Sequence, residues 1–171
     1  FLHEHQVRRI EVFFNPDTDP LGAGWNKRQS EIAVGSGGLH GKGFLKGTQN
    51  ILGFLPRSVA PTDFIFSVIA EEKGFIGSVT VIGLFCVLIL CCVSTAVLTR
   101  DRFGRLLCVG VGAILFCHVF INVAMTVGLM PITGLPLPLL SYGGSFMVVT
   151  LAGLGMVQSV RIRTRLQETY Q

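Results

Sequence analysis

The chain has 171 residues, of which half are hydrophobic and only 14% are charged, and its formal net charge is +4. Soluble domains carry about a quarter charged residues, so this composition indicates a membrane protein and excludes an ordinary soluble domain. The excess positive charge lies next to the apolar runs, so we attribute it to membrane topology and expect no binding of nucleic acid.

Two long uncharged runs predict the membrane-spanning helices. No Asp, Glu, Lys or Arg occurs across residues 74–99 or 106–160. A span needs about 20 apolar residues, so the first run holds one helix. The second run holds two helices, separated by a Pro/Gly-rich stretch at 129–144. We therefore predict an all-α polytopic membrane protein. Its predicted spans are 67–99, 106–128 and 145–160.

The positive charges predict which side of the membrane each connection faces. The link at 100–105 carries three Arg against one Asp, and the tail at 161–171 carries three Arg against one Glu. Short basic loops remain in the cytoplasm, so we expect the link and the tail to be cytoplasmic. Residues 1–66, with short interfacial helices, and the loop at 129–144 are then extracytoplasmic.

The five cysteines all lie in or between the predicted spans, and their spacing matches no metal or redox motif. They are Cys86, Cys91, Cys92, Cys108 and Cys117. We interpret them as small apolar packing residues. No metal site is predicted.

Asp63 is the candidate reactive residue. It follows Pro61 and Thr62 and precedes an apolar Phe-Ile-Phe run at the mouth of the first span. One interpretation is a helix N-cap, which stabilises a helix by about 1 kcal/mol. A second interpretation is a catalytic carboxylate, because apolar surroundings raise the pKa of a carboxyl towards the range of a useful base. A third is a group that handles ions or protons. Glu71 and Glu72 lie too far along a helix to share its proton, and we expect them to be solvated or in salt bridges.

The segment 35–49 contains six glycines and two lysines, Lys42 and Lys46. Glycine-rich backbone can form an anion-binding nest, and the lysines could add charge for a phosphate. The P-loop pattern is not met. The alternative is a flexible basic loop that touches anionic lipid headgroups.

Two further features concern the second uncharged run. His118 and Asn122 lie four residues apart and so share a helix face. We expect them to hydrogen-bond another helix, with a direct substrate role as the alternative. The prolines of 129–144 preclude a regular helix, so this stretch is a plausible cavity wall, because irregular backbone at membrane depth must be covered or line a cavity.

The segments "QSEIAVGSGGLHGKGFLKGTQNILGFLP", "TDFIFSVIAEEKGFIG" and "MPITGLPLPLLSYGGS" resemble the signature segments of the SEDS family (shape, elongation, division and sporulation). They occur in the family's order along nearly the whole chain, and they look closer to its rod-shape branch than to its division branch. The resemblance implies the C-terminal part of a SEDS-type helical bundle with a large extracytoplasmic loop. The chain begins at Phe1 without a signal peptide, so we expect further spans upstream.

The resemblance implies a peptidoglycan glycosyltransferase of the bacterial cytoplasmic (inner) membrane. Such an enzyme polymerises lipid II, an undecaprenyl-diphosphate-linked disaccharide peptide, with inversion, and serves cell elongation and cell shape. The family aspartate of the "TDF" motif falls on Asp63, as general base. We expect a class B penicillin-binding transpeptidase and membrane lipid as partners. The isolated fragment is expected to be inactive.

The resemblance also suggests which residues hold the substrate. Lys42, Lys46 and Arg57 are candidates for binding the leaving diphosphate, and Ser141, Tyr142, Gly143 and Gly144 for lining the lipid-substrate cavity. The sequence identifies no certain cofactor, and a divalent cation bridging the diphosphate is compatible with the chemistry.

The chain departs from the family pattern at two positions, because Pro61 replaces the usual His and Phe146 replaces a common Ser.

The sequence leaves two other functions open. One is a flippase or transporter for the lipid-linked precursor, and the other is a non-catalytic scaffold of the cell-wall synthesis complex.

Overall fold

The computed structural model describes residues 4–52, 54 and 60–169, and within them it contains helices and loops but no strand. Three of the helices are long and apolar enough to cross a membrane, which confirms the predicted all-α membrane class. The elements are α1 (Glu4–Phe14), the 3-10 helix η1 (Pro16–Thr18), α2 (Ala23–Ser36), α3 (Thr48–Ile51), α4 (Ile65–Leu98), α5 (Arg102–Thr126) and α6 (Gly144–Thr169).

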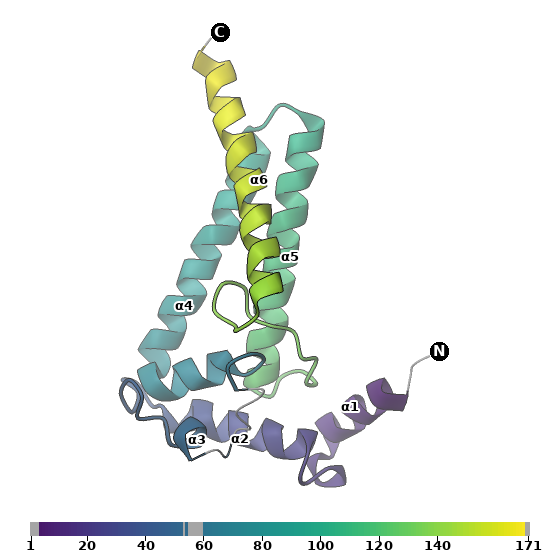
Figure 1. Ribbon diagram of the computed structural model, residues 1–171, viewed down its shortest axis with the longest axis vertical. Helices are drawn as coiled ribbons and strands as arrows, with labels where there is room; N and C mark the ends of the chain where they lie inside the picture. Colours follow the sequence, from purple (N-terminus) through teal and green to yellow (C-terminus); the bar gives the residue numbers. More distant parts are fainter. Residues whose placement is uncertain (1–3, 53, 55–59, 170–171) are drawn as a thin grey trace.

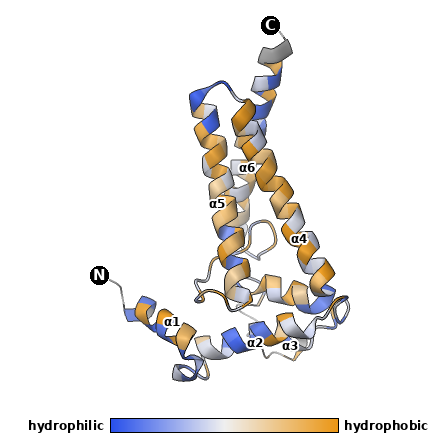
Figure 2. Ribbon diagram, turned by 180° about the vertical axis from the view of Figure 1, so that it is seen from behind, coloured by the Kyte–Doolittle hydropathy of each residue, from blue (hydrophilic) through white to orange (hydrophobic). Residues whose placement is uncertain are grey.

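The three long helices run side by side, and everything before them gathers at one end (Figure 1). Helices α1, α2 and α3 lie across this end, together with the irregular loop between α5 and α6. The short α4–α5 link and the chain's C-terminus lie at the opposite end. Hydrophobic residues dominate the long helices, and hydrophilic residues concentrate at their two ends (Figure 2).

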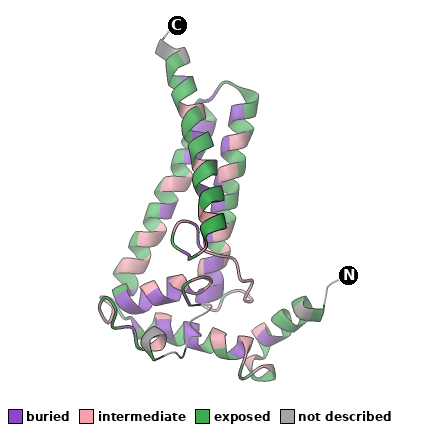
Figure 3. Cartoon of the chain, viewed as in Figure 1, coloured by how far each residue is buried: buried purple, intermediate pink, exposed green. Residues whose placement is uncertain are grey.

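Helix α4 packs most extensively against α5, and buried apolar clusters lie along their contact. One cluster lies towards the α1–α3 end and joins α4 and α5 to the irregular loop through Phe66, Val119 and Leu137. Helix α6 stays largely exposed (Figure 3). Its exposed apolar surface is suited to contact with lipid or with further spans. The membrane boundaries at 67–99, 106–128 and 145–160 stay predictions.

Helix α4 consists of two parts that meet at a sharp bend. Gly74 has φ 66° and ψ −162°, a conformation that essentially only glycine adopts. The first part, Ile65–Lys73, lies across the end of the bundle, and the second part runs along it (Figure 1). We call the first part the crossing segment. The bend places the start of the crossing segment next to the C-terminal part of α5, where Asn122 contacts the main chain of Asp63.

The glycine-rich loop after α2 compensates for the backbone hydrogen bonds that the bend disrupts. Phe75 N donates to Gly38 O at 2.8 Å, and Ile76 N donates to Leu39 O at 3.2 Å. Such close backbone contact needs glycine on both sides. An added Cβ at Gly74 would collide with the backbone nitrogen of Gly41, which itself has φ +77°.

Candidate active site

Asp63 lies directly before α4, and its side chain is half-buried. The helix begins after Phe64, which occupies the N-cap position and is only 1% exposed. No side chain among the described residues forms a capping hydrogen bond at this helix start. The carboxylate of Asp63 is therefore not used as a helix cap, in contrast to the capping interpretation of the sequence.

The surroundings of Asp63 favour its protonated form. Burial raises the pKa of this carboxyl above its ordinary value of 3.8, because a charged carboxylate loses hydration there. A hydrogen bond with the Thr62 side chain and the positive charge of Arg9 offset part of this rise. A carboxylate with a raised pKa binds a proton more readily than an ordinary aspartate, which is the property of a general base.

Arg9 is a residue of this site that the sequence analysis did not find. It lies on α1, and its Nη1 donates to Thr133 O at 2.9 Å. The irregular loop that carries Thr133 also passes the carboxylate, since a Cβ added to the neighbouring Gly134 would lie 3.4 Å from Asp63 Oδ2. The contact joins residues 124 positions apart in the chain, so no local sequence pattern could indicate it.

Asn122 forms a hydrogen bond with the main chain of Asp63. It is fully buried on α5, and its Nδ2 donates to Asp63 O at 2.9 Å and to Leu135 O at 2.7 Å. His118 lies on the same helix face, as predicted, with its Nδ1 3.3 Å from Pro136 O. The partners are carbonyls of Asp63 and of the irregular loop, so the expectation that both residues bond another helix is wrong.

Ser141 and Tyr142 attach the irregular loop to the segment that carries Asp63. Ser141 is buried, and its hydroxyl donates to Thr62 O and accepts from Leu137 N at 2.7 Å. Tyr142 N donates to Pro61 O at 2.9 Å, whereas the Tyr142 side chain is 81% exposed. The structure thus gives Ser141 a role in shaping the loop, and it leaves the phenol of Tyr142 accessible. Gly143 and Gly144 follow directly at the start of α6.

Ser141→Ala is expected to lower the free energy of unfolding by about 1–3 kcal/mol, because it leaves a buried amide and a part-buried carbonyl without their partner. Thermal unfolding of the full-length protein in detergent measures this change. Ser145→Ala is the matched control, since Ser145 is exposed four residues later. Equal unfolding temperatures for the two variants would contradict the structural role of Ser141.

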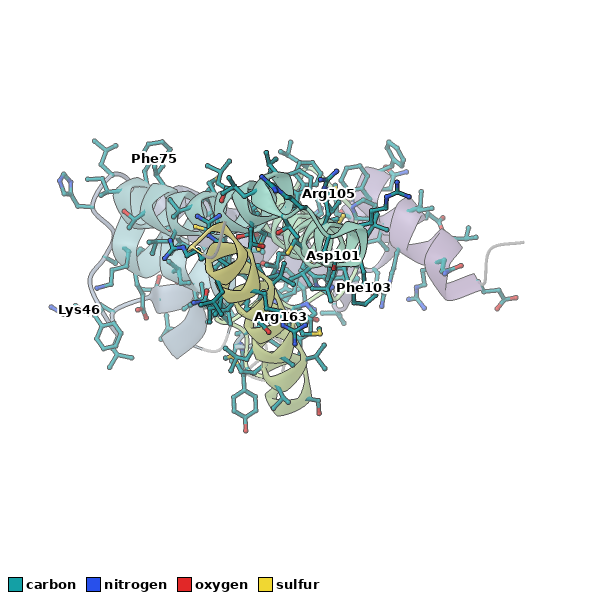
Figure 4. All side chains as sticks on the ribbon, turned by 90° about the horizontal axis from the view of Figure 1, so that it is seen from above. Lys46, Phe75, Asp101, Phe103, Arg105 and Arg163 are labelled. Carbon is teal, nitrogen blue, oxygen red and sulfur yellow. The ribbon has the colours of Figure 1, made fainter. Side chains whose placement is uncertain are left out.

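Of the predicted cations, Lys42 pairs with a carboxylate other than Asp63. Lys42 Nζ lies 2.7 Å from Glu71 Oε1, in a salt bridge. The backbone amides of Lys42 and Gly43 donate to carbonyls of the crossing segment, so this part of the glycine nest is occupied. Lys46 is exposed and reaches outward from the edge of the molecule (Figure 4). Arg57 lies outside the described residues.

The contacts of Lys42 therefore do not support a role in binding substrate, and the roles predicted for Lys46 and Arg57 stay predictions. Within residues 4–52, 54 and 60–169, no group of three or more His, Cys, Asp or Glu side chains could hold a metal ion.

Taken together, the helices and this site define a multi-pass membrane protein with an acid of raised pKa at one end of its spans. The family of FtsW, RodA and SpoVE, described as cell cycle proteins, matches residues 1–166. The chain belongs to this family, which is the SEDS family that its motifs resemble.

Curated relatives of this family match almost the whole chain. Peptidoglycan glycosyltransferase MrdB of Escherichia coli (strain K12) is 45% identical over 165 residues, which are 96% of this chain and 44% of that protein. Peptidoglycan glycosyltransferase RodA of Treponema pallidum (strain Nichols) is 45% identical over 95% of this chain and 37% of its own length. A probable peptidoglycan glycosyltransferase FtsW of Trichlorobacter lovleyi is 40% identical. The chain spans less than half the length of these relatives.

Two solved structures share the fold. One belongs to a peptidoglycan synthase complex that coordinates polymerization and crosslinking. It matches with a TM-score of 0.73 and 35% identity over 94% of this chain and 42% of the solved chain. The other is a mutant of the rod shape determining protein RodA of Thermus thermophilus. Its TM-score is 0.58 and its identity 39%, over 72% of this chain and 38% of that chain.

Proposed function

We propose that the protein to which this chain belongs is a peptidoglycan glycosyltransferase that polymerises lipid II for cell elongation and cell shape. The observation that carries the proposal is the half-buried Asp63, whose pKa is raised by burial and whose main chain is bonded by buried Asn122. Relatives 45% identical to the chain bear the name peptidoglycan glycosyltransferase, which supports the same reaction.

In this reaction Asp63 accepts the proton of a sugar hydroxyl on the acceptor. The hydroxyl oxygen attacks the anomeric carbon of the lipid-linked donor, the configuration inverts, and undecaprenyl diphosphate leaves with the bonding electron pair. A positioned base contributes about 10²–10⁴-fold to such a rate. Asn122 and Ser141 keep the backbone on either side of Asp63 in place, so the carboxylate meets the acceptor in a fixed direction.

The leaving diphosphate needs cations or aimed N–H groups. The positive charge of Arg9 acts on Asp63. Arg9 is therefore a further candidate for binding the diphosphate, which the sequence analysis did not identify. Lys46 and Arg57 remain candidates, and Ser141, Tyr142, Gly143 and Gly144 are proposed to line the path of the lipid substrate. A divalent cation bridging the diphosphate is compatible with this scheme.

The proposed topology places the protein in the bacterial inner membrane. The end that carries Asp63 is extracytoplasmic, and the links at 100–105 and 161–171 are cytoplasmic. The basic residues at 100–105 and 161–171 support this orientation. A class B penicillin-binding transpeptidase is the proposed partner, since one structural relative belongs to a complex that joins polymerization with crosslinking.

The rate of lipid II polymerisation is expected to rise with pH as Asp63 loses its proton, with a midpoint above the ordinary aspartate pKa of 3.8. Arg9→Gln removes a positive charge that lowers this pKa, so the midpoint should move to higher pH. Initial rates of the full-length protein across a pH series measure the shift. Arg8→Gln is the matched control, because exposed Arg8 pairs with Asp19 at 3.5 Å. Identical midpoints for all three proteins would contradict the role of Asp63 as the titrating base.

A further inference from the structure

The far end of the crossing segment carries an ion pair whose carboxylate is buried and whose lysine is partly exposed. Glu71 is 0% exposed, and its Oε1 accepts hydrogen bonds from Lys42 Nζ at 2.7 Å, Thr48 Oγ1 at 2.9 Å and Gln49 N at 3.1 Å. Lys42 Nζ also donates to Thr48 Oγ1 at 2.8 Å. We call these four residues the Lys42 clamp. It connects the crossing segment to the loop after α2 and to the start of α3.

Backbone hydrogen bonds reinforce the clamp. Lys42 N donates to Glu71 O and Gly43 N donates to Glu72 O, both at 3.0 Å. Gly47 leaves room for the carboxylate, since a Cβ there would lie 2.9 Å from Glu71 Oε2. A carboxylate with this many donors and a paired cation is a fully compensated buried charge.

An ion pair with a buried carboxylate contributes little net stability compared with apolar residues of the same shape, because removing the charge from water costs about as much as the attraction returns. The ion pair does, however, restrict the positions of both side chains, since each must keep the direction of its hydrogen bonds. The clamp is therefore better suited to fixing an orientation than to holding the fold together.

The position of the clamp indicates that it fixes the orientation of the crossing segment. Asp63 lies just before the crossing segment, and Glu71 lies near its far end, about 9 Å along the helix from Ile65 at 1.5 Å per residue. Asn122 and Ser141 hold the Asp63 end. The bend at Gly74 comes after Glu71, so α4 beyond the bend does not by itself fix the direction of the segment. Together with the backbone hydrogen bonds to Glu71 O and Glu72 O, the clamp supplies the second fixed point that a rigid segment needs.

We propose that Lys42 and Glu71 are positioning residues for glycosyl transfer, which aim the Asp63 carboxylate by fixing the direction of the helix that follows it. This inference rests on the proposed function. It assigns Lys42 to the enzyme's own framework and not to the substrate phosphate. Loss of the clamp leaves Asp63 attached at its own end but turns its carboxylate away from the acceptor.

The first test is Lys42→Met in the full-length protein, with lipid II as substrate. A misplacement of about 1 Å can cost about 10²-fold in rate, so kcat is expected to fall by that order while KM stays within about twofold. Lys42→Arg keeps the ion pair and should retain most of kcat. Lys73→Met is the matched control, because Lys73 is an exposed lysine on the same segment and should leave kcat unchanged. An unchanged kcat for Lys42→Met overturns the proposal.

A double variant separates positioning from folding. Lys42→Met with Glu71→Met removes both charges, so no uncompensated charge remains buried and the unfolding temperature should rise above that of Lys42→Met alone. Under the proposal kcat stays low in this more stable protein. The midpoint of its pH–rate profile also moves to lower pH, because the carboxylate of Asp63 is less buried. A return of kcat to the wild-type value together with this rise in the unfolding temperature overturns the proposal.

Asp63→Asn in the same assay distinguishes this proposal from the proposed function. If Asp63→Asn abolishes polymerisation and the double variant keeps the wild-type kcat and pH midpoint, the clamp proposal fails and the base survives. If Asp63→Asn polymerises normally, the proposed base fails, and the clamp proposal that rests on it fails as well.

Discussion

Asp63→Asn in the full-length protein is expected to lower the rate of lipid II polymerisation by about 10²–10⁴-fold, which is the contribution of a positioned general base. The amide keeps the size of the side chain but cannot accept the acceptor's proton at neutral pH. Because the side chain caps no helix, the unfolding temperature and the amount of protein in the membrane should be unchanged. Gel analysis of glycan strands formed from labelled lipid II measures the rate.

Asp17→Asn is the matched control, since Asp17 is an exposed aspartate at the same end of the molecule and should leave the rate unchanged. Normal polymerisation by Asp63→Asn would show that this carboxylate is not the base. Labelled lipid II moving across liposomes without strand formation by the wild-type protein would instead indicate a transporter. A wild-type protein that does neither would indicate a scaffold.

Gly74→Ala is expected to have the largest effect on stability. In an ordinary helix, replacing Gly by Ala stabilises by about 0.5–1 kcal/mol. At Gly74 the positive φ alone costs a side chain about 1–3 kcal/mol, and the new Cβ would also collide with the backbone of Gly41. The backbone contacts between the glycine-rich loop and the bend should therefore open. The unfolding temperature and the polymerisation rate of the full-length protein should both fall.

Gly83→Ala provides the comparison for this prediction. Gly83 lies in the second part of α4, and a Cβ added there meets no other atom within 4 Å. This variant should be neutral or slightly more stable, as the helix preference of alanine predicts. If Gly74→Ala behaved in the same way, α4 could be continuous and straight, and the crossing segment would not lie across the end of the bundle.

The sequence by itself determined the membrane class and the place of the candidate base. Uncharged runs long enough to cross a bilayer are a property of local composition, so the all-α class with three spans followed directly. Asp63 stood out since it is a lone acid between a turn and an apolar helix.

Only the tertiary structure decided which residues surround that acid and what the conspicuous lysine does. Arg9 contacts Thr133 and Asn122 bonds Asp63 across separations of 124 and 59 residues, and no pattern of spacing encodes such contacts. Lys42 resembled a phosphate ligand because glycines surround it, yet those glycines allow close packing against the crossing segment, which brings Lys42 to the buried Glu71. A sequence shows which charges a chain carries. Their partners depend on how the backbone brings distant segments together, because charges buried in a medium of low dielectric constant must be paired.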